Sequence, residues 1–358
     1  MKRKDRVTSR DVAALAGVSR SSVSRAFTQG ASISKKTKKR VLKAADKLGY
    51  EPNVMARSLI MRRSNLIGIV MADWVNPFYT IMLRQFSEKL RERGYQLILM
   101  TVNVEDDVDS TLRQLLQYQV DGAIIVSALP SLRLGGQFID KGIPIVLFNR
   151  QGPGIGASSV TGDESAVGRK IATVLVDAGY RRIALIRGNR TVLSGIRKTE
   201  AIVKTVKARK KGKVIASLAD IFGYDAGRAA VLDLMNNKSK PDAIVCSSDL
   251  TAIGVLDGAR IDFGIDVPEE LGIIGFGDAP AARWASNNLT TVRLPVEEMI
   301  DLSIETLLSR LQDPNLEPVS LTANANIVFR GTTRIVEEQV SDQSKYDPLK
   351  NHSFEFVE

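Results

Sequence analysis

Arginine and serine side chains occupy the outward-facing positions of a short predicted helix that spans about residues 20–27. An arginine can donate two hydrogen bonds to guanine O6 and N7, and a serine hydroxyl can donate to or accept from several bases. A helix that lies in the major groove with its first residues at the base edges would present such side chains to DNA. The candidate contacts, which include the residues predicted to cap this helix and the one before it, are Thr8, Ser19, Arg20, Ser21, Ser22, Ser24 and Arg25.

The charge of the chain is concentrated near its N-terminus. Residues 1–63 contain 17 Lys and Arg but only 4 Asp and Glu, a net charge of +13, whereas the other residues contain 33 and 36, a net charge of −3. A small basic module on a near-neutral body indicates a polyanionic partner, in the first place nucleic acid. A basic tail that serves only solubility is the alternative. The basic residues at 35–40 are better suited to contacts with the DNA backbone, or to exposure to solvent alone, than to base recognition.

The basic segment is patterned to fold as a helix-turn-helix. Thr8 and Asp11 have the spacing of a capping box, Gly17 ends the first helix, and Ser19 and Ser34 are good N-caps for a second and a third helix. Two short helices joined by a tight turn are typical of this DNA-binding motif. The apolar residues expected to pack the three helices together are Val12, Leu15, Ala16, Val23, Ala26, Phe27, Val41, Leu42, Ala45 and Leu48.

The stretches VTSRDVAALAGVSRSSVSRAF and SKKTKKRVLKAADKLGYEPNVMARSL, within residues 7–60, resemble the headpiece of the LacI/GalR family of bacterial transcription regulators. The resemblance implies that Arg20, Ser21 and Arg25 read bases. It also implies that residues 52–59 form a hinge helix in the minor groove, with Leu59 as the apolar wedge. Ala56 lies beside that wedge, and Asn53 belongs to the same set of DNA contacts. Minor-groove proteins commonly insert an apolar side chain at a base step and kink the duplex.

Several classes of function are disfavoured by composition. The chain has one cysteine, Cys246, and one histidine, His352, which leaves no Cys/His zinc cluster and no histidine-based catalytic triad in the body. A single cysteine forms no internal disulfide and fits a reducing compartment. No apolar h-region follows the charged N-terminus, and no window of 18 apolar residues occurs. We therefore expect a cytoplasmic protein that is not an enzyme and has no metal, cofactor or membrane contact.

From residue 66 onward, apolar strand patterns alternate with helical patterns. Strands are predicted at about 66–72, 94–102, 121–127 and 143–149, and after residue 162 the theme repeats with strands at 182–188, 214–218, 242–248 and 271–277. Near-continuous apolar strands between helices indicate parallel sheets covered on both faces. The predicted fold is therefore an all-α headpiece with a hinge helix, followed by two doubly wound α/β lobes with a cleft between them.

Ligands of such sheets bind beyond the carboxyl ends of the strands. Polar and aromatic residues at those positions could hold a small polar effector such as a sugar. Two of them have ordinary alternatives, because Asp249 could simply cap the helix that it opens and Arg150 could be an exposed loop residue. The candidate effector contacts are Asp73, Phe78, Asn149, Arg150, Arg197, Phe222 and Asp249.

Residues 64–335 also resemble the LacI/GalR family, whose effector domain has the periplasmic-binding-protein fold. The motifs NPFY, VLFNR, PDAIVCSSDLTAIG, VPEELGIIGFGD and LTTVRLP stand in family order. The chain departs from the family pattern at four places. Gly277 stands where an effector-contacting Asp is usual, Glu200–Ala201 replaces a Gly-Phe pair, Asn287–Asn288 replaces the Pro before LTTV, and Tyr180 replaces a customary His.

The resulting domain assignment is a headpiece at 1–52, a hinge helix and linker at 53–63, an effector-binding and dimerisation domain at 64–335, and a polar tail at 336–358. One headpiece reads too few base pairs for genomic specificity, so we expect a homodimer on a pseudo-palindromic operator of double-stranded DNA. The expected function is transcriptional repression that responds to the effector. The alternative is a small-molecule or sugar-binding protein, or an enzyme, with an incidental basic N-terminus.

Overall fold

The computed structural model describes residues 7–28, 30–51, 63–72, 77–102, 108–126, 131–151, 156–190 and 193–334. The chain divides into two compact units between Asn65 and Leu66, and we call these the headpiece and the body. Four residues predicted to contact DNA or effector lie outside the described residues: Asn53, Ala56, Leu59 and Asp73. The side chain of Phe78 also lies outside them, although its backbone belongs to a helix.

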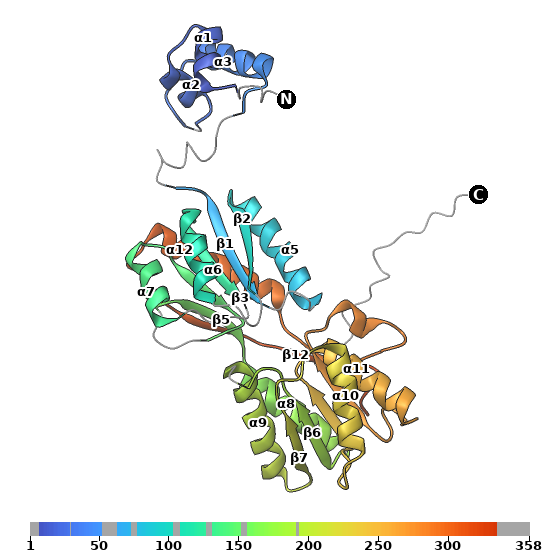
Figure 1. The fold of residues 1–358 in the computed structure, drawn as a ribbon. Coiled ribbons are helices and arrows are strands. Elements are labelled where there is room, and N and C mark those ends of the chain that lie inside the picture. The colour runs from blue at the N-terminus through green and yellow to red at the C-terminus, as the bar shows by residue number, and fades with distance from the viewer. Residues whose placement is uncertain are drawn as a thin grey trace, which may run out of the picture. The chain divides into compact units, whose positions relative to one another are not determined.

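The described residues of the headpiece form three helices: α1 (Ser9–Ala16), α2 (Arg20–Ala26) and α3 (Lys35–Leu48) (Figure 1). Their ends agree with the predicted capping residues, since Gly17 adopts a left-handed φ of 60° and Ser34 Oγ accepts a hydrogen bond from Thr37 N at 3.1 Å. The helices enclose a small core of Val12, Ala13, Ala16, Val23, Ala26, Val41, Ala44 and Ala45.

Two residues predicted for this core are exposed. Leu15 is 47% exposed and Leu42 is 41% exposed. The buried face of α3 instead contains Val41, Ala44 and Ala45, which follow the spacing of one helical stripe, whereas Leu42 lies a full residue step, about 100°, away from Val41. The alanines allow the three short helices to pack closely, and the bulkier leucines remain outside.

The first lobe of the body, lobe 1, is a six-stranded parallel sheet in the order β11-β5-β4-β3-β1-β2. Helices α5 and α12 share a buried apolar cluster with one face of the sheet, and α6 and α7 share a second cluster with the other face. The elements are β1 (Leu66–Ala72), α5 (Pro77–Glu92), β2 (Gln96–Val102), α6 (Val108–Gln117), β3 (Gly122–Val126), α7 (Leu132–Asp140), β4 (Ile145–Phe148), β5 (Ser158–Gly162), α12 (Val296–Gln312) and β11 (Ser320–Ala323).

Lobe 2 is built in the same way around the order β12-β10-β9-β8-β6-β7, in which only the edge strand β12 pairs antiparallel. Helices α8 and α9 cover one face, and α10 and α11 cover the other. The elements are α8 (Glu164–Asp177), β6 (Arg182–Ile186), α9 (Leu193–Arg209), β7 (Lys213–Leu218), α10 (Gly223–Met235), β8 (Ala243–Cys246), α11 (Asp249–Asp257), a π-helical turn η1 (Gly258–Asp262), β9 (Gly272–Phe276), a 3-10 turn η2 (Pro280–Arg283), β10 (Thr291–Arg293) and β12 (Asn326–Val328).

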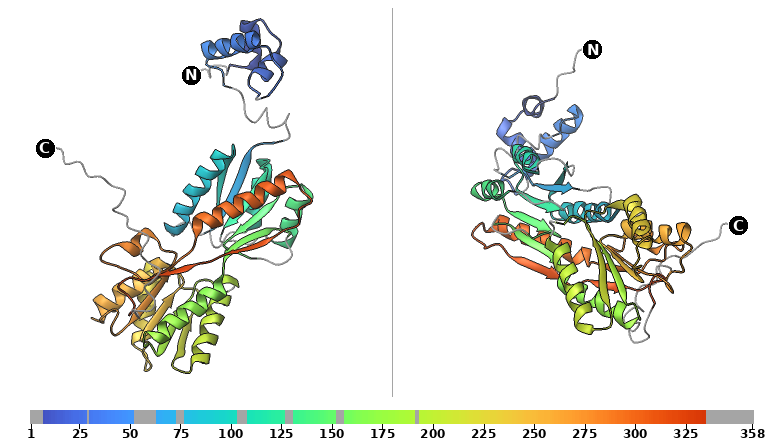
Figure 2. Two further views of the ribbon diagram at one scale, coloured as in Figure 1. Left: turned by 180° about the vertical axis from the view of Figure 1, so that it is seen from behind. Right: turned by 60° about the horizontal axis from the view of Figure 1, so that its bottom comes forward.

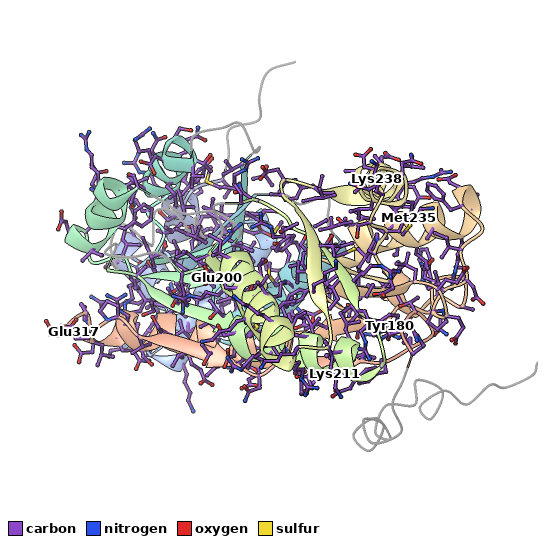
Figure 3. All side chains as sticks on the ribbon, turned by 90° about the horizontal axis from the view of Figure 1, so that it is seen from below. Tyr180, Glu200, Lys211, Met235, Lys238 and Glu317 are labelled. Carbon is purple, nitrogen blue, oxygen red and sulfur yellow. The ribbon has the colours of Figure 1, made fainter. Side chains whose placement is uncertain are left out.

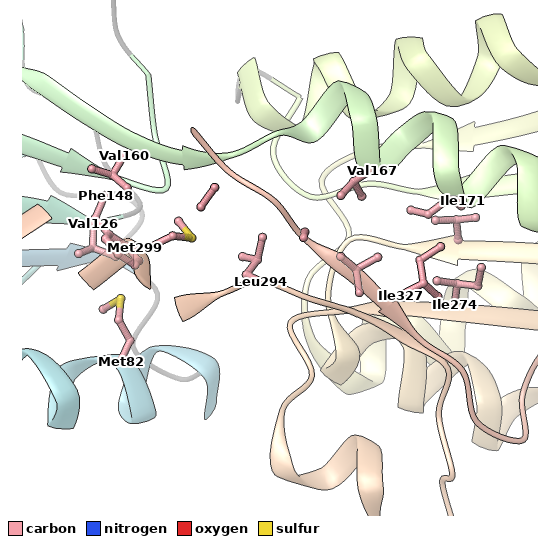
Figure 4. Close-up of a cluster of buried hydrophobic side chains, with 14 of the residues drawn as sticks. Met82, Val126, Phe148, Val160, Val167, Ile171, Ile274, Leu294, Met299 and Ile327 are labelled. Atoms are coloured by element: carbon pink, nitrogen blue, oxygen red, sulfur yellow. The ribbon is translucent and has the colours of Figure 1, made fainter. Parts of the chain in front are cut away.

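Within the described residues, the chain passes between the lobes three times, after β5, after β10 and after β11. The C-terminal strands run from one lobe into the other in the left-hand view of Figure 2. The lobes are therefore interleaved, whereas the sequence pattern suggested two successive halves. Leu294, in the second crossing, is 4% exposed and lies between Phe148 of lobe 1 and Ile327 of lobe 2 (Figure 4). The buried core thus continues through the crossings.

Candidate functional site

The exposed face of α2 carries the side chains predicted to contact DNA. Val23 and Ala26 are buried, and this places Arg20, Ser21, Ser24 and Arg25 on the outside of the helix, with Ser22 half-buried. In the described headpiece, no acidic residue lies in the first turn of α2, and the basic charges of α2 and α3 are exposed. The arrangement can present two guanidinium groups and several hydroxyls to one strip of a polyanion.

Two of the predicted contact residues also fix the starts of helices. Ser19 Oγ accepts a hydrogen bond from Ser22 N at 3.2 Å and lies 2.8 Å from Ser21 Oγ. Thr8 donates to Asp11 Oδ2 twice, from its backbone N–H at 2.8 Å and from its hydroxyl at 2.7 Å, and the backbone bond is the main cause that lowers the pKa of Asp11. These hydroxyls orient the helices whether or not they also contact DNA.

Arg40 has a role that sequence reasoning missed. The sequence placed it in a basic run for phosphate contacts or solvation, but its guanidinium donates to the carbonyl oxygens of Ala16 and Gly17. It thereby satisfies carbonyls at the C-terminal end of α1, where a positive charge is favourable. The local sequence around Arg40 gave no signal for this role, because Arg40 is exposed on α3 and its partners belong to another helix of the headpiece. The turn between α1 and α2 is therefore fixed to α3.

Asn149 and Arg150 follow β4 directly, at the carboxyl edge of the lobe 1 sheet. Asn149 has a left-handed φ of 55°, which asparagine tolerates better than most residues, and its N–H donates to Val160 O at 2.8 Å. Its side-chain Oδ1 is buried without a hydrogen-bond partner among the described residues. Arg150 is half-buried rather than an exposed loop residue, and burial lowers the pKa of Arg150.

Arg197, from α9 of lobe 2, donates a hydrogen bond to Gln151 Oε1 of lobe 1. This bond connects the two lobes next to Asn149 and Arg150, which directly precede Gln151 in the chain. A pocket of about 60 Å³ opens beside it and is lined from both lobes by Gln151, Thr161, Gly162, Asp163, Glu164, Ser165, Ser194, Arg197 and Thr322. The sequence predicted Arg197 but not Gln151, because the pair joins residues that are distant along the chain.

Phe222 and Asp249 lie at the starts of two helices on the other face of lobe 2. Phe222 is 53% exposed, and its ring lies against the backbone of Gly188. Asp249 is only 2% exposed, and it does not cap α11, because Ser248 is the N-cap. The carboxylate of Asp249 accepts from Ala279 N at 2.6 Å and from Thr291 Oγ1 at 2.5 Å. Burial raises the pKa of Asp249 to about 6. Both oxygens are thus engaged inside the lobe, and its contact with an effector remains a prediction.

Next to Gly277, the side chain of Asp278 is 1% exposed and is surrounded by arginines. Its oxygens lie 2.5 Å from Arg293 Nε, 2.5 Å from an Arg330 nitrogen and 3.2 Å from an Arg283 nitrogen. Burial acts to raise the pKa of Asp278, but the bonds from Arg330 and Arg293 outweigh it, so the pKa is lowered. Because Arg293 ends β10 just before the second crossing, this cluster fixes the crossing to the end of β9.

The other departures from the family pattern have structural roles or lie on the surface. Tyr180 is fully buried, and its hydroxyl donates to Pro268 O and accepts from Arg334 N, both at 3.0 Å. Asn287 donates to Ala281 O at 2.7 Å. Glu200 lies on the exposed side of α9 (Figure 3). The neighbouring Ala201 faces Gly168 of α8, where only small residues fit between the two helices.

The part of the chain that the structure describes was also searched for metal-ligand clusters and for membrane-spanning helices. No group of three His, Cys, Asp or Glu residues could hold a metal ion there. None of the described helices has the length and apolar character that crossing a membrane requires.

Comparisons with known proteins connect both units to one family. The family model "Bacterial regulatory proteins, lacI family" matches residues 8–53, and the model "Periplasmic binding protein-like domain" matches residues 172–333. The HTH-type transcriptional regulator CelR of Thermobifida fusca is 30% identical over 339 residues, which are 92% of this chain and 99% of that protein. The ribose operon repressor of Escherichia coli (strain K12) is 29% identical over 91% of this chain and 99% of that protein.

The fold of the chain is also similar to the folds of solved structures. The lac repressor dimer bound to operator and the anti-inducer ONPF has a TM-score of 0.82 at 22% identity, covering 92% of this chain and 99% of that chain. The CelR–cellobiose complex has a TM-score of 0.68 at 29% identity, covering 91% and 100%. These relatives are transcriptional regulators, which sets aside an enzyme with an incidental basic N-terminus. The chain belongs to the lacI family of bacterial regulatory proteins.

Proposed function

We propose that two copies of this transcriptional regulator bind a pseudo-palindromic DNA operator in the cytoplasm and repress transcription in a manner controlled by a small polar effector of the sugar type. The observation that carries the proposal is the exposed arginine and serine face of α2, built on a buried three-helix core within a segment of net charge +13. The hinge segment 53–63, with Asn53, Ala56 and Leu59, completes the proposed DNA contacts.

A homodimer follows from the size of the headpiece. One recognition helix contacts only a few base pairs, and two copies related by a twofold axis supply the specificity that a genome requires. The solved lac repressor that this chain resembles in fold is described as a dimer on its operator. On the body, Ile261 and Trp284 are 69% and 61% exposed, and burial of such residues against a second copy would stabilise the dimer.

The effector site is proposed at the carboxyl edges of the two sheets, with Asn149, Arg150, Arg197 and Phe222 as contacts and with Asp73, Phe78 and Asp249 completing the set. The orphan Oδ1 of Asn149 and the bond between the lobes from Arg197 to Gln151 support this location. A relative in the family was solved as a cellobiose complex, which favours a sugar-like molecule here. The effector acts only through the difference in its affinity for the two lobe arrangements.

The proposal is tested by selecting DNA fragments from a random library with the full-length protein and measuring their binding at several salt concentrations. We expect a pseudo-palindromic site whose affinity falls with salt on a log–log slope of about −0.9 for each neutralised phosphate. Deletion of residues 1–63 should abolish this binding. A protein that stays monomeric at micromolar concentration and shows no preference among duplex sequences would refute the proposal.

A further inference from the structure

A buried ion pair lies beside the pocket between the lobes, and its charged groups make no hydrogen bonds with the residues that the structure describes. Glu164, the first residue of α8, is 7% exposed, and Lys198 of α9 is 9% exposed. Glu164 Oε2 and Lys198 Nζ are 3.9 Å apart, which is too long for a hydrogen bond, and Oε2 has no partner among the described residues. Lys198 Nζ lies 3.5 Å from the centre of the Phe276 ring, which partly compensates its charge.

The pair is situated where the proposed effector would bind. Glu164 follows the first crossing between the lobes and lines the 60 Å³ pocket together with Arg197 and Gln151. The ring that Lys198 contacts belongs to Phe276, the last residue of β9, so the ammonium group also lies at the carboxyl edge of the lobe 2 sheet. Whole-ligand pockets measure roughly 300–1,000 Å³, so this pocket has room for one functional group of a larger ligand.

Burial of such a pair without hydrogen bonds is unfavourable for the protein alone. An ion pair compensates desolvation well only when hydrogen bonds satisfy the remaining lone pairs and protons. Burial raises the pKa of Glu164 and lowers the pKa of Lys198, and each charge opposes the shift of the other. Glu164, which lines the pocket, therefore carries a buried acceptor oxygen that no donor of the described residues uses.

The charges around the pocket decide what kind of donor fits. Two anions, Glu164 and Asp163, and one cation, Arg197, line the pocket, and the ammonium group of Lys198 lies 3.9 Å from Glu164 outside the lining. The four charges balance, so neither an acidic nor a basic ligand group gains a large net attraction. One oxygen of Asp163 already accepts from Ala166 N at 2.8 Å, which leaves Glu164 as the acceptor without a hydrogen bond. A hydroxyl group carries no charge and can donate to a carboxylate while it accepts from a guanidinium.

This inference rests on the proposed effector site. We propose that Glu164 is a specificity-determining contact that accepts a hydrogen bond from a hydroxyl group of an uncharged, polyhydroxylated effector, and that Lys198 positions the Glu164 carboxylate as its counter-ion. Arg197, which lines the same pocket, can donate to the same hydroxyl. The site thereby selects neutral sugars over sugar acids and amino sugars.

The first experiment compares matched ligands on the full-length protein by calorimetry and thermal shift at constant ionic strength. The probes are glucose, glucuronate and glucosamine, the corresponding galactose set, and the neutral sugars ribose and cellobiose. We expect at least one neutral sugar to bind and to stabilise the protein in proportion to its concentration, and the acid and the amine to bind more weakly than their neutral parent. A sugar acid or an amino sugar that binds more tightly than its parent overturns the proposal, and so does the failure of every neutral sugar to bind.

The second experiment tests the residues with the neutral sugar that binds. Glu164→Gln replaces a charge-assisted hydrogen bond by a neutral one, and we expect the Kd to rise about tenfold. Glu200→Gln, an exposed change of the same kind on α9, is the matched control and should leave the Kd unchanged. Lys198→Arg should retain most of the affinity, whereas Lys198→Met should weaken binding further as pH is lowered, because an unpaired Glu164 takes up a proton more readily. Lys204→Met is the exposed control for the lysine.

A folding defect is separated from a binding defect with the double variant Glu164→Gln/Lys198→Met, which removes both buried charges and should remain folded. Wild-type affinity for the sugar in this variant would show that the pair is only structural and would overturn the proposal. Sugar binding is measured without DNA, so the outcome does not depend on operator binding. Loss of sequence-selective DNA binding in the wild-type protein would instead refute the proposed function.

Discussion

The headpiece and the body arrange their candidate functional side chains in different ways. In the headpiece, one helix presents Arg20, Ser21, Ser24 and Arg25 to the outside, and the periodicity around Val23 and Ala26 alone determines which side chains face outward. In the body, the pocket joins residues from β5, α8, α9 and β11 that are far apart in sequence. The face proposed to bind DNA therefore depends on the local sequence of about seven residues, whereas the proposed effector pocket depends on the topology of the body.

The two units also treat charge differently. The headpiece exposes its lysines and arginines, so their field acts on a partner. The body buries charges within networks, as at Asp278 with its three arginines and at the Glu164–Lys198 pair. Changes of charge should consequently affect DNA affinity in the headpiece and folding stability in the body.

The largest effect that separates the two units is expected from Asp278→Asn. Asparagine fits the space and tolerates the left-handed φ of 51°, so the change removes the charge and leaves the arginines without their buried anion. Breaking a buried pair on one side costs about 3–5 kcal/mol. Urea unfolding combined with hydrogen exchange should show this loss in the body but unchanged protection in the headpiece.

The control for Asp278→Asn is Asp177→Asn, which removes a partner of Arg209 in a half-exposed ion pair on α8 and α9. Exposed ion pairs contribute only about 0–1 kcal/mol, so this variant should unfold nearly as the wild type does. Equal destabilisation by the two variants would contradict the distinction between buried and surface charge in the body.

How well the sequence predicted the structure also differs between the headpiece and the body. Helix bounds of the headpiece were predicted nearly to the residue because Thr8, Gly17, Ser19 and Ser34 signal helix ends locally. The central strands of both lobes were predicted from their apolar runs. Strands of three or four residues such as β10, β11 and β12 carry too little pattern, and α12 was also missed, so the interleaving of the lobes stayed hidden.

The sequence likewise selected some residues near the candidate effector site and missed others. The search at strand ends selected Asn149, Arg150 and Arg197 as candidate effector contacts, because parallel sheets bind ligands there, and these contacts remain predictions. Gln151, Glu164 and Lys198 were missed, because the pocket and the ion pair beside it join residues that are far apart in the sequence and leave no local signal. Asp249 was predicted correctly to lie at a helix start, but its burial and its bonds to Thr291 and Ala279 depend on elements that join lobe 2 later in the chain.

Asp249 gives a prediction for pH dependence that should appear in the body alone. The pKa of Asp249 is about 6 in the folded protein, whereas the ordinary value for an aspartate is 3.8. The folded state therefore holds the proton more tightly than the unfolded state does. The stabilising contribution of the protonated form is therefore fully present below about pH 4 and is lost as pH rises through 6, a total of roughly 3 kcal/mol.

The measurement is the free energy of unfolding of wild type and Asp249→Asn at several pH values between 4 and 7. Because the variant does not titrate at this position, the wild type should gain about 1.4 kcal/mol relative to the variant for each pH unit between 6 and 4. A difference that stays constant with pH would contradict the raised pKa of Asp249.

Arg25→Ala tests whether the headpiece face reads sequence or only charge. If Arg25 pairs with a guanine edge, its loss should weaken binding to the cognate site by about 1–3 kcal/mol and relax selection at one base position. Lys39→Ala, on the exposed side of α3, should instead weaken binding equally on all sequences and reduce the salt slope by about one. Quantitative selection with both variants distinguishes the roles, and uniform weakening by Arg25→Ala would make it a phosphate contact.

The smallest expected effect separates helix capping from DNA contact at Ser19. Ser19 and Ser34 cap α2 and α3 with similar hydrogen bonds, at 3.2 and 3.1 Å, so replacement of either by alanine should destabilise the headpiece by about 1 kcal/mol. Hydrogen exchange of the headpiece amides in the full-length protein measures this loss of stability.

Asparagine is as good an N-cap as serine, so Ser19→Asn and Ser34→Asn should both retain the stability that the alanine variants lose. Operator affinity should then return fully for Ser34→Asn and only in part for Ser19→Asn, because Ser19 lies beside Arg20 on the face that we propose to contact DNA. Full recovery in both would assign Ser19 to capping alone.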